Sequence, residues 1–227
     1  MAQAQTISFE SSEGTSSGYL ARPERRSRDG RPGVVVIQEW WGLVPHIKDV
    51  TRRFAEQGYI ALAPDLYHGK TTVEAEEAHH LAEGLDWGRA AAEMAGAVRY
   101  LREREGTTSV GVVGFCMGGA LAMIAATGEG VDAYASFYGF PPAGAAPVDE
   151  IEEPGVIFFG SEEDNFSVPD VQAFAERQQA KGRETEVVVY EGAGHAFFND
   201  TRPKAYNADA AAAAWQRTLE LFERTLH

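Results

Sequence analysis

Val110-Gly-Val-Val-Gly114-Phe-Cys116-Met-Gly118-Gly-Ala-Leu-Ala122 is the stretch of this 227-residue chain that decides the fold. It begins as an apolar, β-branched run typical of a strand buried on both faces and continues as a helix of small residues. Glycines two residues before and two residues after Cys116 leave room for a sharp strand-to-helix turn that projects the cysteine above the sheet. Gly-x-Cys-x-Gly is therefore the pattern of a nucleophile elbow, with sulfur in place of serine oxygen. The N-terminus of the following helix favours thiolate over thiol.

Other readings of this turn are a phosphate-binding loop, a dinucleotide fingerprint or a structural cysteine. A phosphate-binding loop needs Gly-Lys-Ser/Thr, and Met117-Gly-Gly-Ala does not supply it. The spacing Gly111-Val-Val-Gly114 is wrong for a dinucleotide fingerprint. A buried cysteine without chemistry stays open at this point, because free cysteine is among the most buried residue types.

Strand-like and helix-like segments alternate on both sides of this turn. Continuous apolar runs predict strands at 34–37, 59–63, 110–113, 133–138, 156–159 and 186–190, with helices between them, including a long one at 87–104 and one at the C-terminus. Residues 140–154 are proline-rich and predict a long surface connection. Repeated strand–helix–strand units predict an α/β fold with a mostly parallel sheet and helices on both faces, as a single domain over residues 1–227.

Composition narrows the function classes. The chain carries 20 basic and 34 acidic residues, a net charge of −14, so we expect no nucleic-acid or membrane partner. No export signal or long apolar run is present, which predicts a cytoplasmic protein, and we expect a monomer without a cofactor. Cys116 is the only cysteine, so neither a disulfide nor a cysteine zinc site can form. Glu76, His79, His80 and Glu83 share one helix face, which we interpret as a solvated face and not as a metal site.

An acid and a histidine follow Cys116 in the order that an α/β-hydrolase needs. The strand at 156–159 leads to Asp164, and the strand at 186–190 leads to His195. Both lie at the sheet edge where Cys116 is expected, so Asp164 could orient His195 and His195 could act as base for Cys116. The alternative for Asp164 is an ordinary loop acid, since Glu162 and Glu163 adjoin it.

The strand at 34–37 ends in Gln38-Glu39-Trp40-Trp41-Gly42, on the same predicted edge. Glu39 places a carboxylate beside Cys116, unless it is only a solvated charge. The backbone N–H groups of Trp40 and Met117 are candidates for an oxyanion hole. Trp40 and Trp41 also fit ordinary core packing.

Together these motifs resemble the dienelactone hydrolase family, the cysteine branch of the α/β-hydrolase fold. The likeness rests on four segments, which are Val-Val-Ile-Gln-Glu39-Trp-Trp-Gly, Ala63-Pro-Asp-Leu-Tyr67, Gly114-Phe-Cys116-Met-Gly-Gly and Gly192-Ala-Gly-His195-Ala-Phe. The resemblance implies a Cys116–His195–Asp164 triad that cleaves esters or lactones through an acyl-thioester. It also implies that Glu39 contacts the resting thiol until substrate displaces it, and that Trp40 and Met117 hold the oxyanion.

One departure bears on the substrate. Where the family has a carboxylate-binding arginine four residues after the histidine, this chain has Asn199, and Arg202 is out of register. No arginine occurs between Arg53 and Arg89 for the second clamp. We therefore expect an uncharged small-molecule ester or lactone as substrate, with Trp40, Trp41, Phe197 and Phe198 as apolar walls. Thioester or phosphotriester cleavage at the same site, and a non-catalytic binder or thiol sensor, stay open as alternatives.

Overall fold

A computed structural model describes residues 2–24 and 32–227 of the chain. Its eight strands form one sheet in the order β1-β2-β4-β3-β5-β6-β7-β8. The strands from β4 to β8 run parallel, whereas β1 and β2 pair antiparallel with each other and β2 pairs antiparallel with β4. Their bounds are β1 Gln3–Ser11, β2 Gly14–Arg22, β3 Gly33–Ile37, β4 Ile60–Pro64, β5 Val110–Phe115, β6 Ala133–Phe137, β7 Gly155–Glu162 and β8 Thr185–Gly194. The predicted α/β-hydrolase fold with a mostly parallel sheet is confirmed.

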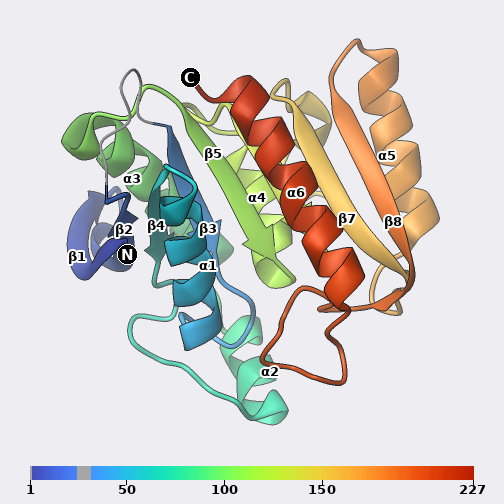
Figure 1. Cartoon of the computed structure of the whole chain (residues 1–227), viewed down its shortest axis with the longest axis horizontal. Coiled ribbons are helices and arrows are strands. Elements are labelled where there is room, and N and C mark those ends of the chain that lie inside the picture. Colours follow the sequence, from blue (N-terminus) through green and yellow to red (C-terminus); the bar gives the residue numbers. More distant parts are fainter. Residues whose placement is uncertain (1, 25–31) are drawn as a thin grey trace.

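Helices cover both faces of the sheet (Figure 1). One face carries α1 and α6, whose Phe54 and Trp215 rings touch with centroids 4.5 Å apart. The other face carries α3 and α4, and α5 packs beside β8 at the far end of the sheet. The bounds are α1 Pro45–Glu56, α2 Ala75–Glu83, α3 Trp87–Tyr100, α4 Met117–Ala125, α5 Val168–Ala180 and α6 Ala208–Thr225; η1 Leu101–Glu105 continues α3 as a π-helix, and η2 Val148–Glu150 is one turn of 3-10 helix.

The hairpin of β1 and β2 has no counterpart among the strands predicted from apolar runs. Its first strand is largely exposed, and only Phe9 of β1 is fully buried. Because β1 is an edge strand with one wet face, its residues form no continuous apolar run. The helix predicted at 87–104 is present but ends as the π-helical turn of η1.

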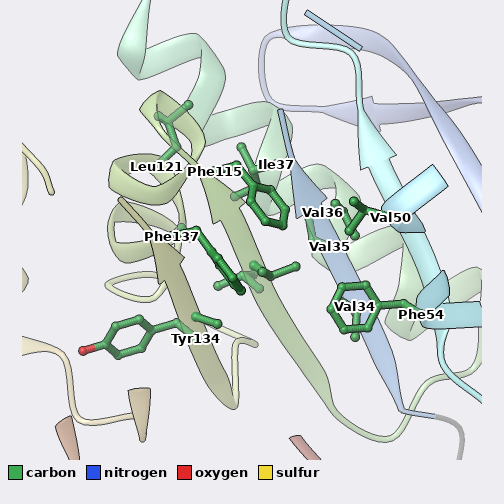
Figure 2. Close-up of a cluster of buried hydrophobic side chains, with 14 of the residues drawn as sticks. Val34, Val35, Val36, Ile37, Val50, Phe54, Phe115, Leu121, Tyr134 and Phe137 are labelled. Atoms are coloured by element: carbon green, nitrogen blue, oxygen red, sulfur yellow. The ribbon is translucent and has the colours of Figure 1, made fainter. Parts of the chain in front are cut away.

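The central strands form the core. Every residue of β3, β4, β5 and β6 is buried. Figure 2 shows Val34 to Ile37 of β3 within this core, with Val50 and Phe54 of α1 to one side in the view and Phe115 of β5 and Phe137 of β6 to the other. Burial on both faces explains why these strands read as unbroken apolar runs.

The carboxyl ends of the parallel strands lie together at the lower edge in Figure 1, where β5 meets α4 and the chain after β8 loops back. In open parallel sheets this edge is where ligands bind. The predicted site residues Glu39, Cys116 and His195 all follow strands that end there.

Candidate active site

Cys116 sits on a strained turn between β5 and α4. Its backbone has φ 55° and ψ −120°, a region that side chains other than glycine rarely adopt. The Cys116 N–H donates to the carbonyl of Phe137 at 2.9 Å, which fixes the turn to β6. The side chain is half-buried, as a nucleophile must be if it is to meet a substrate.

The glycines around Cys116 are required by close backbone contacts. A Cβ atom on Gly114 would lie 1.8 Å from the carbonyl oxygen of Gly118, and one on Gly118 would lie 2.4 Å from that of Gln38. Neither distance is possible without moving backbone. The steric logic of the Gly-x-Cys-x-Gly pattern therefore holds in the structure.

His195 follows β8 directly and reaches the sulfur. Its Nε2 lies 3.2 Å from Cys116 Sγ, within hydrogen-bonding distance for sulfur. Its Nδ1 lies 2.9 Å and 3.1 Å from the two carboxylate oxygens of Glu163. The three side chains thus lie in the order of a candidate nucleophile, a candidate base and an acid that orients the base.

The prediction of Asp164 as the orienting acid is wrong in geometry. Asp164 is exposed and accepts a hydrogen bond from the Asn165 side chain at 3.1 Å, whereas the Glu163 side chain is fully buried against His195. The register of β7 and β8 shifts between Gly160 and Glu162. This irregularity changes which of the consecutive acids faces the histidine, and counting residues past the strand could not reveal it.

Electrostatics support the same pairing. Burial tends to lower the pKa of His195, but its hydrogen bonds with Cys116 and Glu163 outweigh burial and raise that pKa to about 10. Burial tends to raise the pKa of Glu163, but hydrogen bonds from His195 and Asn165 lower it overall. At neutral pH Glu163 is therefore a carboxylate and His195 carries its proton as long as the sulfur is available as partner.

Glu39 lies in the same pocket but bonds elsewhere. It is 1% exposed, accepts from Tyr138 Oη at 3.2 Å on one oxygen and from Asn199 Nδ2 at 2.6 Å on the other. This differs from the resting contact between Glu39 and Cys116 that the resemblance implies, because here the sulfur pairs with His195. Burial raises the pKa of Glu39 against the opposing influence of His46 and the two hydrogen bonds.

Asn199, which stands where the resemblance implies an arginine, is held by contacts within the protein. It is 1% exposed, and its Oδ1 accepts from both the backbone N–H and the hydroxyl of Thr201 while its Nδ2 binds Glu39. Both the amide oxygen and the amide nitrogen of Asn199 therefore bond to groups of the protein itself. Asn199 thus anchors the loop after β8 to the carboxylate at the end of β3.

A cavity of about 940 Å³ opens over the Cys116–His195 pair. Trp40 and Trp41 line it, as predicted from the sequence. Met117, predicted as an oxyanion donor, lines it as well. Met117 is the first residue of α4, so its N–H has no carbonyl one turn earlier to accept it and is available at the sulfur. Trp87, Phe140 and Phe166 also line the cavity, and sequence reasoning missed them because they come from a helix start and from loops.

The prediction that Phe197 and Phe198 form pocket walls is wrong. They are 0% and 2% exposed and pack into the core, where Phe198 stacks on Phe115 with ring centroids 5.1 Å apart and Phe197 contacts Tyr138 at 5.3 Å. After His195 the chain turns at Ala196, which has φ 62°, so the next two side chains point inward.

A cation does reach the pocket wall. Arg202, which is out of register with the family's arginine, lies with its guanidinium carbon 3.6 Å from the centroid of the Trp41 ring. Its Nη2 donates to the carbonyl of Val73 at 3.4 Å, and Lys204 lines the same wall. Arg202 therefore lines the pocket although it is out of register, and it is engaged with an aromatic face and a carbonyl.

Within residues 2–24 and 32–227, no three His, Cys, Asp or Glu side chains are grouped so that they could hold a metal ion. His79 and His80 contact Glu83 at 3.3 Å and 3.9 Å on an exposed helix face. In the same part of the chain, every helix is too short or too polar to cross a bilayer.

The amino-acid sequence matches one known family. The profile of the dienelactone hydrolase family matches residues 17–226. Protein usf of Aquifex pyrophilus is 35% identical over 233 residues, which cover 98% of this chain and 99% of the relative. A Synechocystis protein with the provisional name carboxymethylenebutenolidase is 34% identical over 231 residues, 92% of each chain.

Solved structures agree in fold. The crystal structure of a provisionally named dienelactone hydrolase from Klebsiella pneumoniae superposes with a TM-score of 0.86 at 26% identity, over 98% of this chain and 99% of that one. A dienelactone hydrolase-like promiscuous phosphotriesterase from metagenomic libraries gives a TM-score of 0.87 at 24% identity, over 100% and 99% of the two chains. At that identity the second likeness concerns the fold alone.

Proposed function

Because the chain belongs to the dienelactone hydrolase family, and so is a hydrolase of the ester or lactone type, we propose that it cleaves carboxylic esters or lactones with Cys116 as nucleophile. The observation that carries this proposal is the line from Glu163 through His195 to Cys116, with contacts of 2.9 Å and 3.2 Å. These are the distances at which an acid orients a base and a base serves a nucleophile.

The reaction proceeds in two halves. The proton between Cys116 Sγ and His195 Nε2 is on Nε2 as Sγ attacks the carbonyl carbon, and the carbonyl oxygen takes up negative charge that the N–H groups of Trp40 and Met117 stabilise. The carbon–oxygen bond to the alcohol breaks as His195 Nε2 gives its proton to the leaving oxygen, which leaves an acyl-thioester on Cys116. His195, now neutral, removes a proton from water, the water oxygen attacks the thioester carbonyl, and the acid leaves as the sulfur is regenerated.

Glu163 and Glu39 have different roles in this proposal. Glu163 bonds Nδ1 of His195, which fixes the ring so that Nε2 faces the sulfur, and its negative charge stabilises the imidazolium. Glu39 acts on the charge balance of the pocket, since a negative charge there also favours the protonated histidine. Tyr138 and Asn199 hold it in place.

The substrate that we propose is an uncharged ester or lactone. The pocket is lined mainly by aromatic and apolar side chains, including Trp40, Trp87 and Phe166. Asn199, at the position of the family's arginine, is occupied by Glu39. The Arg202 guanidinium lies over the Trp41 ring, so a carboxylate-bearing ester would have to compete with that contact.

The test is hydrolysis of p-nitrophenyl butyrate by the wild type and by Cys116→Ala. We expect the variant to lose at least about 10³-fold in kcat, because without sulfur no acyl-enzyme forms. Mass spectrometry of the quenched wild type should find the acyl group on Cys116. Undiminished turnover by Cys116→Ala would sink the assignment.

A substrate panel separates the alternatives. Thioesters, phosphotriesters and mono-p-nitrophenyl succinate are compared with the butyrate ester at equal concentration. Preference for a thioester or phosphotriester would change the proposed substrate but keep the nucleophile. Binding of the esters without turnover of any, and without alkylation of Cys116 by iodoacetamide, would favour a non-catalytic binder.

We also propose that the protein acts as a monomer in the cytoplasm, where a single thiol stays reduced. Light scattering of the purified protein checks the first point, and fractionation of cells checks the second. A stable dimer or an exported protein would overturn them.

A further inference from the structure

A second cavity lies next to the active-site pocket. It has a volume of about 490 Å³, within the range of small-molecule sites, and lies between the 140–150 connection and the start of α5. Phe140, Pro142 and Phe166 line both this cavity and the active-site pocket. The two spaces therefore meet at these three side chains.

The meeting point is beside the catalytic histidine. The Phe166 ring lies nearly parallel to the His195 ring, with centroids 6.2 Å apart and an interplanar angle of 23°. Phe140 is held from the other side by Phe174 of α5, with ring centroids 5.3 Å apart. Phe166, which covers one side of the His195 ring, thus belongs to the wall that the two cavities share.

The chemistry indicates which half of the substrate lies on the side of His195 that Phe166 covers. His195 must deliver its proton to the oxygen of the leaving alcohol, so the alcohol lies against His195 when the bond breaks. The acyl half stays on the sulfur, between Cys116 and the oxyanion donors. We propose, on the basis of the function proposed above, that the second cavity is the subsite for the alcohol half of the ester.

The lining indicates which alcohol fits. Val148 and the prolines of the 140–150 connection give the cavity an apolar rim, and the buried Val171 and Phe174 lie beneath its floor. Asp149, Glu150 and Asp170 also border it, and Arg177 offsets only Asp149, through a contact of 3.3 Å. An extended, uncharged alkyl or aryl alcohol gains from burial there, whereas an anionic one meets excess negative charge.

The experiment compares two ester series on the wild type. Acetates of methanol, butanol, hexanol and octanol vary the alcohol, and methyl esters of the corresponding acids vary the acyl group. The readout is kcat/KM, because all acetates share one acyl-enzyme and kcat would hide the alcohol if deacylation limits it. We expect kcat/KM to rise about two- to fourfold per methylene in the alcohol series until the cavity is filled.

Ala146→Trp fills the cavity, since Ala146 lines it. Ala145→Trp is the matched control, because the neighbouring Ala145 is exposed and belongs to the same connection. We expect Ala146→Trp to abolish the rise with alcohol length, to leave methyl acetate and the acyl series unchanged, and to differ in this from Ala145→Trp. Ala143→Leu, a smaller filling change at another lining position, should shorten the longest alcohol that is still favoured.

The subsite is overturned by any of three results. In the first, kcat/KM of the wild type does not change with alcohol length. In the second, the rise in kcat/KM survives in Ala146→Trp, and in the third, both filling variants lose kcat/KM equally on all esters. These outcomes are separate from failure of the proposed function. If Cys116→Ala abolishes hydrolysis but the alcohol series is flat, only the subsite is wrong. If the wild type hydrolyses no ester, both proposals are wrong.

Discussion

At the scale of the residue, the site depends on which of several adjacent acids faces His195. Glu162, Glu163 and Asp164 follow one another, yet Glu163 alone of these three has its side chain buried against the histidine. The neighbouring Asp164 stays at the surface. Of two adjacent carboxylates, Glu163 therefore bonds His195 and Asp164 does not.

Glu163→Gln and Asp164→Asn form a matched pair that tests this assignment. Glu163→Gln keeps the shape but cannot stabilise the imidazolium, so we expect kcat/KM on p-nitrophenyl butyrate to fall about 10²- to 10⁴-fold. Asp164→Asn should stay within about threefold of the wild type. Stopped assays with both purified variants measure the difference, and the reverse order would restore Asp164 as the acid.

At the scale of the element, the strand–turn–helix unit of β5 and α4 holds Cys116, the proposed nucleophile, through close contacts of its glycines. The strained backbone at Cys116 persists only because β3, β5, β6 and α4 approach one another closely. Gly118 lies against the carbonyls of Ile37 and Gln38 at the end of β3. The same contact thus brings Glu39 and Cys116 to neighbouring positions.

Gly118→Ala should disturb both the fold and the site. The added Cβ would lie 2.4 Å and 2.5 Å from backbone oxygens, so we expect a loss of about 2–4 kcal/mol in the free energy of unfolding and a fall in activity. The control is Gly88→Ala in α3, where the added methyl meets only the Asp86 side chain at 3.3 Å and helix propensity improves. Urea unfolding of both variants checks this, and equal stabilities would contradict the steric argument.

At the scale of the whole molecule, pairing between groups from distant parts of the chain makes stability depend on pH. The raised pKa of His195 means that its stabilising contribution is complete below pH 6.5 and is lost as the pH rises through about 10. Glu163 acts in the opposite direction, because its lowered pKa gives stability above pH 4.5 that is lost in acid. The contribution of this site to the free energy of unfolding is therefore greatest between pH 4.5 and pH 6.5.

The alkaline limb can be measured directly. We expect the free energy of unfolding of the wild type to decline between pH 6.5 and pH 10 relative to His195→Gln. Cys116→Ala keeps the histidine but removes a hydrogen-bond partner that raises its pKa, so its decline should be smaller. Urea denaturation across this range provides the curves. Parallel curves for the wild type and both variants would contradict the pairing.

The sequence alone predicted the order and type of the central elements and the pairing of Cys116 with His195. Strands buried on both faces read as unbroken apolar runs, and an elbow demands glycines at fixed spacing, so both signals are local. The exposed β1 strand lacked such a run and could not be predicted in the same way.

Only the tertiary structure decided which acid serves His195, which aromatic residues line the pocket and where Arg202 lies. The register shift between β7 and β8 selects Glu163, the turn at Ala196 sends Phe197 and Phe198 into the core, and the loop after Asn199 carries Arg202 onto Trp41. These outcomes depend on contacts between segments far apart in the chain. A pattern of neighbouring residues carries the preferences of each segment, but the direction of a loop side chain is set by the elements that pack around it.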